Sequence, residues 1–222
     1  MSENTDDIIK RLKLTMAADS YPVLEDIKYF GQYNNHIEES FGESISSIGS
    51  IPKNKDGSRT ELDMDKVRQL SERKKHSAFR NIMRASLLTA LCAFIENVIK
   101  TPCLTDGRKS RYKSHCKKIK NSDSSDKSTI GIAKSFLIKE GFNDIDNLTG
   151  WDYIKNMMQI RNRFVHNGGQ VTSHIQANSG SYDLVIKNNE IILGNTFIED
   201  YITFVESFSI KFAKIVYVDE SK

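Results

Sequence analysis

Hydrophobic side chains recur at helical spacing along the first hundred residues of the chain. This spacing predicts helices from about Asp6 to Ala18 and from Pro22 to Ile48. A further region, from about Leu62 to Lys100, is predicted as one long helix or two consecutive ones. Gly49 to Arg59 holds turn-forming residues without periodicity, so we expect a loop there.

Helical spacing resumes after a polar stretch in the middle of the chain. It predicts one helix from Ile130 to Ile138 and another from about Thr149 to Asn167. We expect Thr149 to begin the second of these, with Asp152 as its capping-box partner. Two glycines follow and provide the stop signal, because glycine adopts the left-handed conformation that ends many helices.

The last part of the chain combines a hairpin pattern with a helical one. Tyr182 to Ile186 and Ile191 to Leu193, joined by the polar link Lys187 to Glu190, predict a short β-hairpin. Thr196, with Glu199 at the capping-box position, predicts the start of a final amphipathic helix that ends near Val216. The expected class is all-α, a helical bundle with one small β-hairpin before the last helix.

Length and composition fit one domain. A chain of 222 residues, of which 38% are hydrophobic, can bury one ordinary core. We expect a single domain over residues 1–222, with N-terminal helices in about residues 1–60 and the core in residues 61–217. The first sixty residues carry no specific functional signal.

One predicted helix is apolar nearly all round. The stretch from Phe79 to Ile99 must therefore be covered by neighbouring helices or by a second subunit. Its most apolar part, Leu87 to Ile95, is interrupted by Thr89 and is about half a membrane span. The N-terminus, Met1 to Asp7, is acidic and unlike a signal peptide. We expect a core helix and no membrane segment.

The cysteines indicate a reducing compartment. Cys92, Cys103 and Cys116 make an odd number without a CxxC pair, which argues against a disulfide framework and a cysteine-rich zinc site. A zinc site built from Cys103, His115 and Cys116 lacks the usual ligand spacing. We expect a cytoplasmic protein without a disulfide framework or a cysteine-rich zinc site.

Basic residues gather in one segment although the net charge is only +3. Residues 107–120 include seven lysines or arginines in fourteen positions. We expect a mobile basic segment there, which as a solvated loop would need no function and as a binding surface would suit a polyanion. Its candidate contact residues are Arg108, Lys109, Arg111, Lys113, Lys117 and Lys118.

An arginine interrupts the apolar stripe of the helix predicted at 149–167. At about 100° per residue, Arg161 falls inside a stripe formed by Ile154, Met157, Met158, Ile160, Phe164 and Val165. A guanidinium cannot be neutralised at ordinary pH, so it must meet a carboxylate, a ligand or water in a cleft. We expect Arg161 to occupy one of these three settings.

A carboxylate on the long central helix is a candidate partner for this arginine. Glu96 lies at the end of a strip of small side chains formed by Ala85, Thr89, Cys92 and Ala93, which would let another helix approach closely. We therefore hypothesise that Glu96 accepts a hydrogen bond from Arg161 or orients it. The alternative is an ordinary structural ion pair without chemistry.

A histidine lies near the end of the helix that carries the arginine. Asn162 and His166 are four residues apart and so share one face beside the apolar stripe. The last turn of a helix favours a cation, which suits a group that takes up and releases a proton near neutral pH. The alternative is a solvated histidine or a helix cap.

The run Ile160 to Gly169, with the sequence IRNRFVHNGG, resembles the R-N-x-x-x-H signature of the HEPN superfamily. These are helical ribonucleases that include bacterial toxins, abortive-infection proteins and CRISPR effectors. The resemblance covers about residues 62–216 and is compatible with the RiboL-PSP-HEPN subgroup or related Abi-like proteins. Glu96 resembles the acidic residue that these families often carry on an earlier helix. HEPN toxins silenced by tyrosine modification carry that tyrosine two places after the histidine, where this chain has Gly168.

The resemblance implies an endoribonuclease that cleaves RNA without a metal and needs no cofactor. In that chemistry the ribose 2′-hydroxyl attacks the adjacent phosphorus and leaves a 2′,3′-cyclic phosphate. His166 would act as general base or acid, Arg161 would hold the phosphate, and Asn162 would orient either of them. Residues 108–120 would hold the RNA backbone, with Tyr112 available to stack on a base.

Partners follow from the resemblance and from the spacing of the motif. Arg161 and His166 lie about 140° apart around one helix, so one copy does not aim both at a single point without help, whereas two copies could. HEPN proteins pair in this way, so the resemblance implies a homodimer with a composite active site. An unrestrained nuclease harms its host, so we also expect a regulatory partner, such as an antitoxin, an ATPase or a nucleotidyltransferase.

Two other functions remain open from the sequence. The first is a non-catalytic HEPN-like module that binds RNA or a nucleotide, or pairs with a nucleotidyltransferase or ATPase. In that case Arg161 and His166 would contact phosphate without cleaving it. The second is a purely structural helical dimer in which the motif is coincidental.

Overall fold

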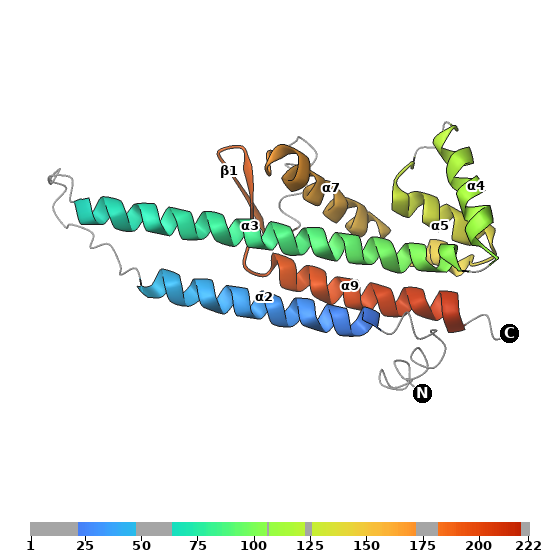
Figure 1. Ribbon diagram of the computed structural model, residues 1–222, viewed down its shortest axis with the longest axis horizontal. Coiled ribbons are helices and arrows are strands. Elements are labelled where there is room, and N and C mark those ends of the chain that lie inside the picture. The colour runs from blue at the N-terminus through green and yellow to red at the C-terminus, as the bar shows by residue number, and fades with distance from the viewer. Residues whose placement is uncertain (1–21, 48–63, 106, 123–125, 172–181, 219–222) are drawn as a thin grey trace.

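The long central helix organises the molecule. The computed structural model describes residues 22–47, 64–105, 107–122, 126–171 and 182–218. Within them, α3 (Met64–Lys100) is one uninterrupted helix against which most of the other elements pack (Figure 1). The predicted helix at 6–18 and the predicted loop at 49–59 lie outside the described residues.

Two helices cover one side of α3. These are α2 (Pro22–Ser47), close to its predicted bounds, and α9 (Phe197–Ala213), which continues into a π-helical turn over Lys214–Val218. Figure 1 shows them side by side along α3, and in this view α5 (Thr129–Lys139) and α7 (Trp151–Asn167) are drawn along the other edge of α3. The start of α7 also contacts α9, through Trp151 and Phe208, so one core lies where α3, α7 and α9 meet.

Three further helices and two short turns complete the helical part. They are α4 (Lys109–Lys120), α5 (Thr129–Lys139), α7 (Trp151–Asn167), the 3-10 turn η2 (Thr101–Leu104) and the four-residue α6 (Asp144–Asn147). The predictions for α5 and α7 are confirmed, whereas α6 was not predicted. The all-α class with one hairpin is confirmed over the described residues.

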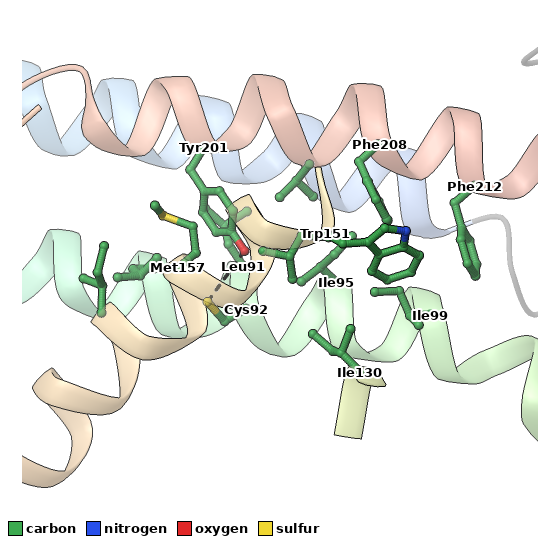
Figure 2. Packing of buried hydrophobic residues seen from close by; sticks show 14 of the residues in the cluster. Leu91, Cys92, Ile95, Ile99, Ile130, Trp151, Met157, Tyr201, Phe208 and Phe212 are labelled. Carbon is green, nitrogen blue, oxygen red and sulfur yellow. Dashed lines mark hydrogen bonds between the residues drawn. The ribbon is translucent and has the colours of Figure 1, made fainter. Parts of the chain in front are cut away.

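The buried faces of α3, α7 and α9 meet in an aromatic and aliphatic core (Figure 2). Trp151, at the start of α7, packs edge to face on Phe208, with ring centroids 5.1 Å apart. Its indole N–H donates to the Ile145 carbonyl oxygen over 3.0 Å. Cys92 lies 3.6 Å from the Tyr201 hydroxyl, and burial raises the pKa of this thiol to about 11. Cys92 is thus a packing residue, since a buried thiol is inert.

The hairpin consists of β1 (Leu184–Lys187) and β2 (Glu190–Leu193), paired antiparallel with Lys187 opposite Glu190. The turn is therefore Asn188–Asn189, two residues shorter than the predicted link. Both asparagines have positive φ values, 52° and 65°, as a type I′ turn requires. Asn81 of α3 holds β2, because its amide donates to the Ile191 carbonyl oxygen and accepts from the Leu193 N–H.

A buried ionic cluster joins α2, α3 and the segment before α9. Arg84, only 5% exposed, donates to both carboxylate oxygens of Glu38, to the Leu193 carbonyl oxygen and to the Asn195 side chain. Arg80 is paired with the same carboxylate. Every charged group in this cluster has a partner, which is what makes burial of ions tolerable. We call these residues the Arg84 cluster.

Two predicted capping boxes are wrong. Gly150, with φ of +110°, precedes α7 and no side chain caps its first turn, so α7 begins at Trp151 rather than at Thr149. At α9, Thr196 is the N-cap residue, but its side chain does not cap the helix. Its N–H instead donates to Asp183, which precedes the hairpin. A carboxylate from a distant segment replaced the predicted local partner.

The apolar central helix is only partly covered. Leu88, Leu91 and Ile95 are fully buried, whereas Phe79 and Ile82 remain 61% and 59% exposed. By length and composition alone, the segment Val67–Leu104 could cross a membrane, so the apolar part of this helix is longer than the predicted stretch from Leu87 to Ile95. A helix that packs inside a core passes the same criterion.

Candidate functional site

The glycines that follow α7 fix where the helix stops. Gly168 has φ of +58° and Gly169 has φ of +84°, values that favour glycine, so the predicted stop is confirmed. The Gly169 N–H donates to the Arg163 carbonyl oxygen over 2.9 Å, and its own carbonyl accepts from the Ile191 N–H. A Cβ on Gly169 would lie 3.0 Å from the Phe164 ring. The end of α7 is therefore tied to the hairpin.

The predicted apolar stripe of α7 is largely confirmed. Ile154, Met157 and Ile160 are buried. Val165 is 51% exposed, so its assignment to the stripe is wrong. It lies about 60° around the helix from the polar position Asn162, at the edge of the stripe nearest to solvent.

Arg161 lies in this stripe with its side chain half-buried. Its Nε is buried and has no hydrogen-bond partner, and one terminal nitrogen lies 3.6 Å from the Met158 sulfur. Its charge also acts on the Cys92 thiol and the Tyr201 hydroxyl, so the guanidinium reaches the core. No ion pair involves Arg161 within the residues that the structure describes.

Arg161 opens into a pocket of about 690 Å³ between α3, α7 and the start of α5. We call it the Arg161 pocket. Its wall also includes Asn162 and Glu96, so three of the four predicted catalytic residues share one cavity. The complete lining is Glu96, Asp126, Ser128, Thr129, Ile130, Lys155, Met158, Gln159, Arg161 and Asn162.

The predicted direct contact between Glu96 and Arg161 is not present. No hydrogen bond or ion pair joins the two side chains, although both line the pocket and all of this part of the chain is described. The structure therefore places the guanidinium in a cleft, which was one of the three predicted settings, rather than on a carboxylate.

His166 lies outside the Arg161 pocket. Its side chain is exposed near the end of α7 and does not belong to the pocket lining. It shares a helix face with Asn162 and lies about 6 Å further along the axis, at 1.5 Å per residue. Asn162 therefore lies both in the pocket wall and on the helix face that carries His166.

A second cavity of about 580 Å³ runs along α3 on the other side of the end of α7. We call it the α3 groove. Ile82, Ala85 and Thr89 of α3 line it together with Phe164 and Val165 of α7. Two members of the strip of small side chains, Ala85 and Thr89, thus leave this groove open towards solvent instead of filling it.

The basic segment is a helix and not a mobile loop, so that prediction is wrong. Tyr112 is buried with its ring centroid 5.2 Å from that of Phe136, which anchors α4 on α5. Tyr112 is therefore not free to stack on a base. Arg108 lies 4.0 Å from Glu140, and Arg111 is hydrogen-bonded to the same carboxylate. The candidate lysines remain exposed on α4, namely Lys109, Lys113, Lys117 and Lys118.

The sequence did not identify two charged residues of the pocket wall, Lys155 and Asp126. Lys155 precedes Asn162 by seven residues, so helical periodicity alone would have placed it on the same face. Asp126 comes from a different segment and pairs with Lys155 over 2.9 Å. Burial raises the pKa of Asp126, but hydrogen bonds from Ser128 and Lys155 outweigh this and hold it below its usual value. No local pattern predicts that contact.

Metal ligands are not gathered at this site. Over the described ranges, no three His, Cys, Asp or Glu side chains lie close enough together to hold a metal ion. In the comparisons with known proteins, no family model matches the chain, and no curated protein and no solved structure matches it either. The functional argument therefore depends on the residues themselves.

Proposed function

We propose that this protein is a metal-independent endoribonuclease of the HEPN type, acting in the cytoplasm as a toxin or an anti-phage effector. The observation that carries the proposal is the half-buried Arg161, whose Nε has no partner and which opens into a cleft one helical turn from His166. A permanent charge kept unpaired in this way is available to an anionic ligand. A phosphodiester next to a proton-transferring imidazole meets that description.

The reaction that fits these groups is an internal transfer within RNA. A base removes the proton of the ribose 2′-hydroxyl, the 2′-oxygen bonds to the adjacent phosphorus, and the bond to the 5′-oxygen breaks. An acid then protonates that oxygen, which gives a 2′,3′-cyclic phosphate and a 5′-hydroxyl. His166 supplies one of the two proton transfers, and Arg161 stabilises the charge that builds on the phosphate oxygens.

One copy of the chain supplies only part of this arrangement. Arg161 and His166 diverge by about 140° around α7, so the proposal includes a twofold dimer in which the two copies of α7 face each other. The exposed apolar side chains of Ile82 and Val165 beside the α3 groove support an interface at that end of α7. A second copy there would bring another His166 near the first.

The first test compares RNA cleavage by the wild type with cleavage by Arg161→Ala and His166→Ala. Arg163→Ala is the matched control, because Arg163 is on the same helix but about 200° from Arg161. We expect cleavage with 2′,3′-cyclic phosphate ends by the wild type and the control. We expect each of the other two variants to lose about a hundredfold or more.

A non-catalytic nucleotide- or RNA-binding module is the competing function. It predicts that wild type and variants leave RNA intact while Arg161→Ala weakens RNA binding. Analytical ultracentrifugation tests the dimer separately. A monomer at micromolar concentration contradicts the composite site, and introducing a charge with Ile82→Glu should dissociate a genuine dimer.

A further inference from the structure

Two opposite charges share the Arg161 pocket without contacting each other. Glu96 enters from α3 and Arg161 from α7, and no hydrogen bond or ion pair connects them within the described chain. Opposite charges in a half-buried cleft usually pair, directly or through a group between them. A ligand that offers donors on one edge and acceptors on another would satisfy both charges at once.

Part of the remaining wall, which also contains the Lys155–Asp126 ion pair, suits a flat aromatic ring. Met158 and Ile130 provide apolar surface, and Gln159 and Asn162 provide amide groups. The volume of about 690 Å³ lies in the range of pockets that enclose small organic ligands. A nucleobase has this combination of apolar faces and polar edges.

We propose that the Arg161 pocket binds a guanine base of the RNA, with Glu96 as the residue that selects it. This inference rests on the proposed function and assigns its base specificity. A carboxylate only accepts hydrogen bonds, and guanine presents two adjacent donors, N1–H and N2–H, that both carboxylate oxygens meet side by side. Its O6 and N7 acceptors are then available to donors on α7.

The other bases fit this carboxylate less well. Adenine and cytosine each offer a single donor, an exocyclic amine. The ring nitrogen beside that amine is an acceptor, so it would face the second carboxylate oxygen and be repelled by it. Uracil offers one N–H between two carbonyl oxygens, and both would be repelled. A site whose polar groups all pair with the right base discriminates strongly against the other bases, because a wrong base leaves some of these groups without a hydrogen-bond partner.

The position of the pocket relative to the histidine agrees with this assignment. Asn162 lines the pocket and His166 lies about 6 Å further along α7. A base held at Glu96 therefore leaves its phosphate near Asn162 and His166. The Arg161 guanidinium has five N–H donors, enough to meet both the base and the phosphate. Cleavage is then expected at a phosphate next to a guanosine.

The first experiment measures binding without cleavage. The 5′-monophosphates of guanosine, adenosine, cytidine and uridine are titrated into the full-length protein and followed by calorimetry. We expect the guanosine nucleotide to bind about tenfold more tightly than the other three, or better. Glu96→Gln should abolish that preference, and Glu72→Gln, on the same helix outside the pocket, should keep it.

The second experiment maps cleavage sites in RNA of random sequence by sequencing the new 5′-hydroxyl ends. The wild type should cut next to guanosine, and Glu96→Gln should cut with reduced base preference. Wild-type selectivity is measured without any variant, so a folding defect in Glu96→Gln leaves this test intact.

The outcomes separate this inference from the proposed function. Cleavage without base preference, together with equal affinity for the four nucleotides, overturns the guanine assignment and leaves the ribonuclease intact. Selective guanosine nucleotide binding without any RNA cleavage supports the pocket and overturns the ribonuclease. A preference for guanosine that Glu96→Gln does not change overturns the role of Glu96.

Discussion

Arg84 and Arg161 are two arginines in contact with the core, and their surroundings differ in kind. Arg84 is 5% exposed, and hydrogen bonds to Glu38, Leu193 and Asn195 use all three of its nitrogens. Arg161 is half-buried and its Nε has no hydrogen-bond partner; a methionine sulfur lies near one terminal nitrogen, and the guanidinium also acts on the Cys92 thiol. Both side chains end in a guanidinium, but only in Arg84 do acceptors of the protein take up hydrogen bonds from all three nitrogens.

The difference teaches how to separate structural from functional charges. A saturated guanidinium ties together the segments that supply its acceptors, here α2, α3 and the chain before α9. An unsaturated one keeps its donors available at a cost in stability, which a ligand can offset. Mutations should therefore affect folding at Arg84 and ligand chemistry at Arg161.

The largest effect is expected from Arg84→Ala. It leaves the half-buried Glu38 carboxylate with Arg80 alone and removes the donor from the Leu193 carbonyl oxygen. The free energy of unfolding should fall by about 3–5 kcal/mol. Urea denaturation followed by circular dichroism measures this change. A loss below about 1 kcal/mol would contradict the structural role of the cluster.

Arg161→Ala should show the opposite profile. We expect RNA cleavage to fall by about 10²–10³-fold, as is typical when one donor to a developing oxyanion is removed. Unfolding should change far less than in Arg84→Ala, since no ion pair is broken. Cleavage assays and urea midpoints of the two variants, measured in parallel, give the comparison. A large loss of stability with full activity would remove the distinction between the two arginines.

A smaller effect is expected from pH, because the loss of stability on acidification depends in part on Glu38 in the Arg84 cluster. Burial raises the pKa of Glu38, but hydrogen bonds from Arg84 and Arg80 outweigh it, so the folded pKa lies below the ordinary value of about 4.3. Glu38 therefore stabilises the fold above that value and loses its contribution as pH falls through the folded pKa. Urea midpoints between pH 7 and pH 3 should fall less steeply in Glu38→Gln than in the wild type.

The smallest effect is expected at the hairpin turn, which positions the acceptors of Arg84. Asn189 has φ of 65°, where glycine is preferred. Asn189→Gly should raise the free energy of unfolding by about 0.5 kcal/mol and Asn189→Ala should lower it. Urea denaturation curves of the two variants measure whether the free energy of unfolding rises or falls. Cleavage should stay at the wild-type level in both variants, because neither turn residue lines the Arg161 pocket.

Periodicity predicted the helices well, because a buried stripe recurs locally in the sequence. The bounds expected for α2, α3 and α5 were correct to within two residues over the described chain. The sequence pattern did not predict α4, because its many basic residues leave only a narrow apolar face, formed by Tyr112, Cys116 and Ile119. The capping boxes failed because Gly150 and Asp183 took the places of local partners.

The site was predictable only along α7. Helical spacing identified Arg161 as an anomaly and placed Asn162 beside His166, but it gave no distances to other helices. The expected contact with Glu96 required knowing how far α3 lies from α7, which depends on packing over the whole interface. Asp126 reaches Lys155 from a separate segment, so only the tertiary structure reveals that side of the pocket.

The unbroken course of α3 has a geometric consequence. The helix carries Arg84 and Glu96 on one rigid rod, so the angular offset between them is set by counting residues. Inserting a single alanine between these positions would leave the first half in register and rotate everything beyond it by about 100°. Glu96 would then point away from α7. The number of residues between Arg84 and Glu96 on α3 therefore determines whether Glu96 lines the Arg161 pocket.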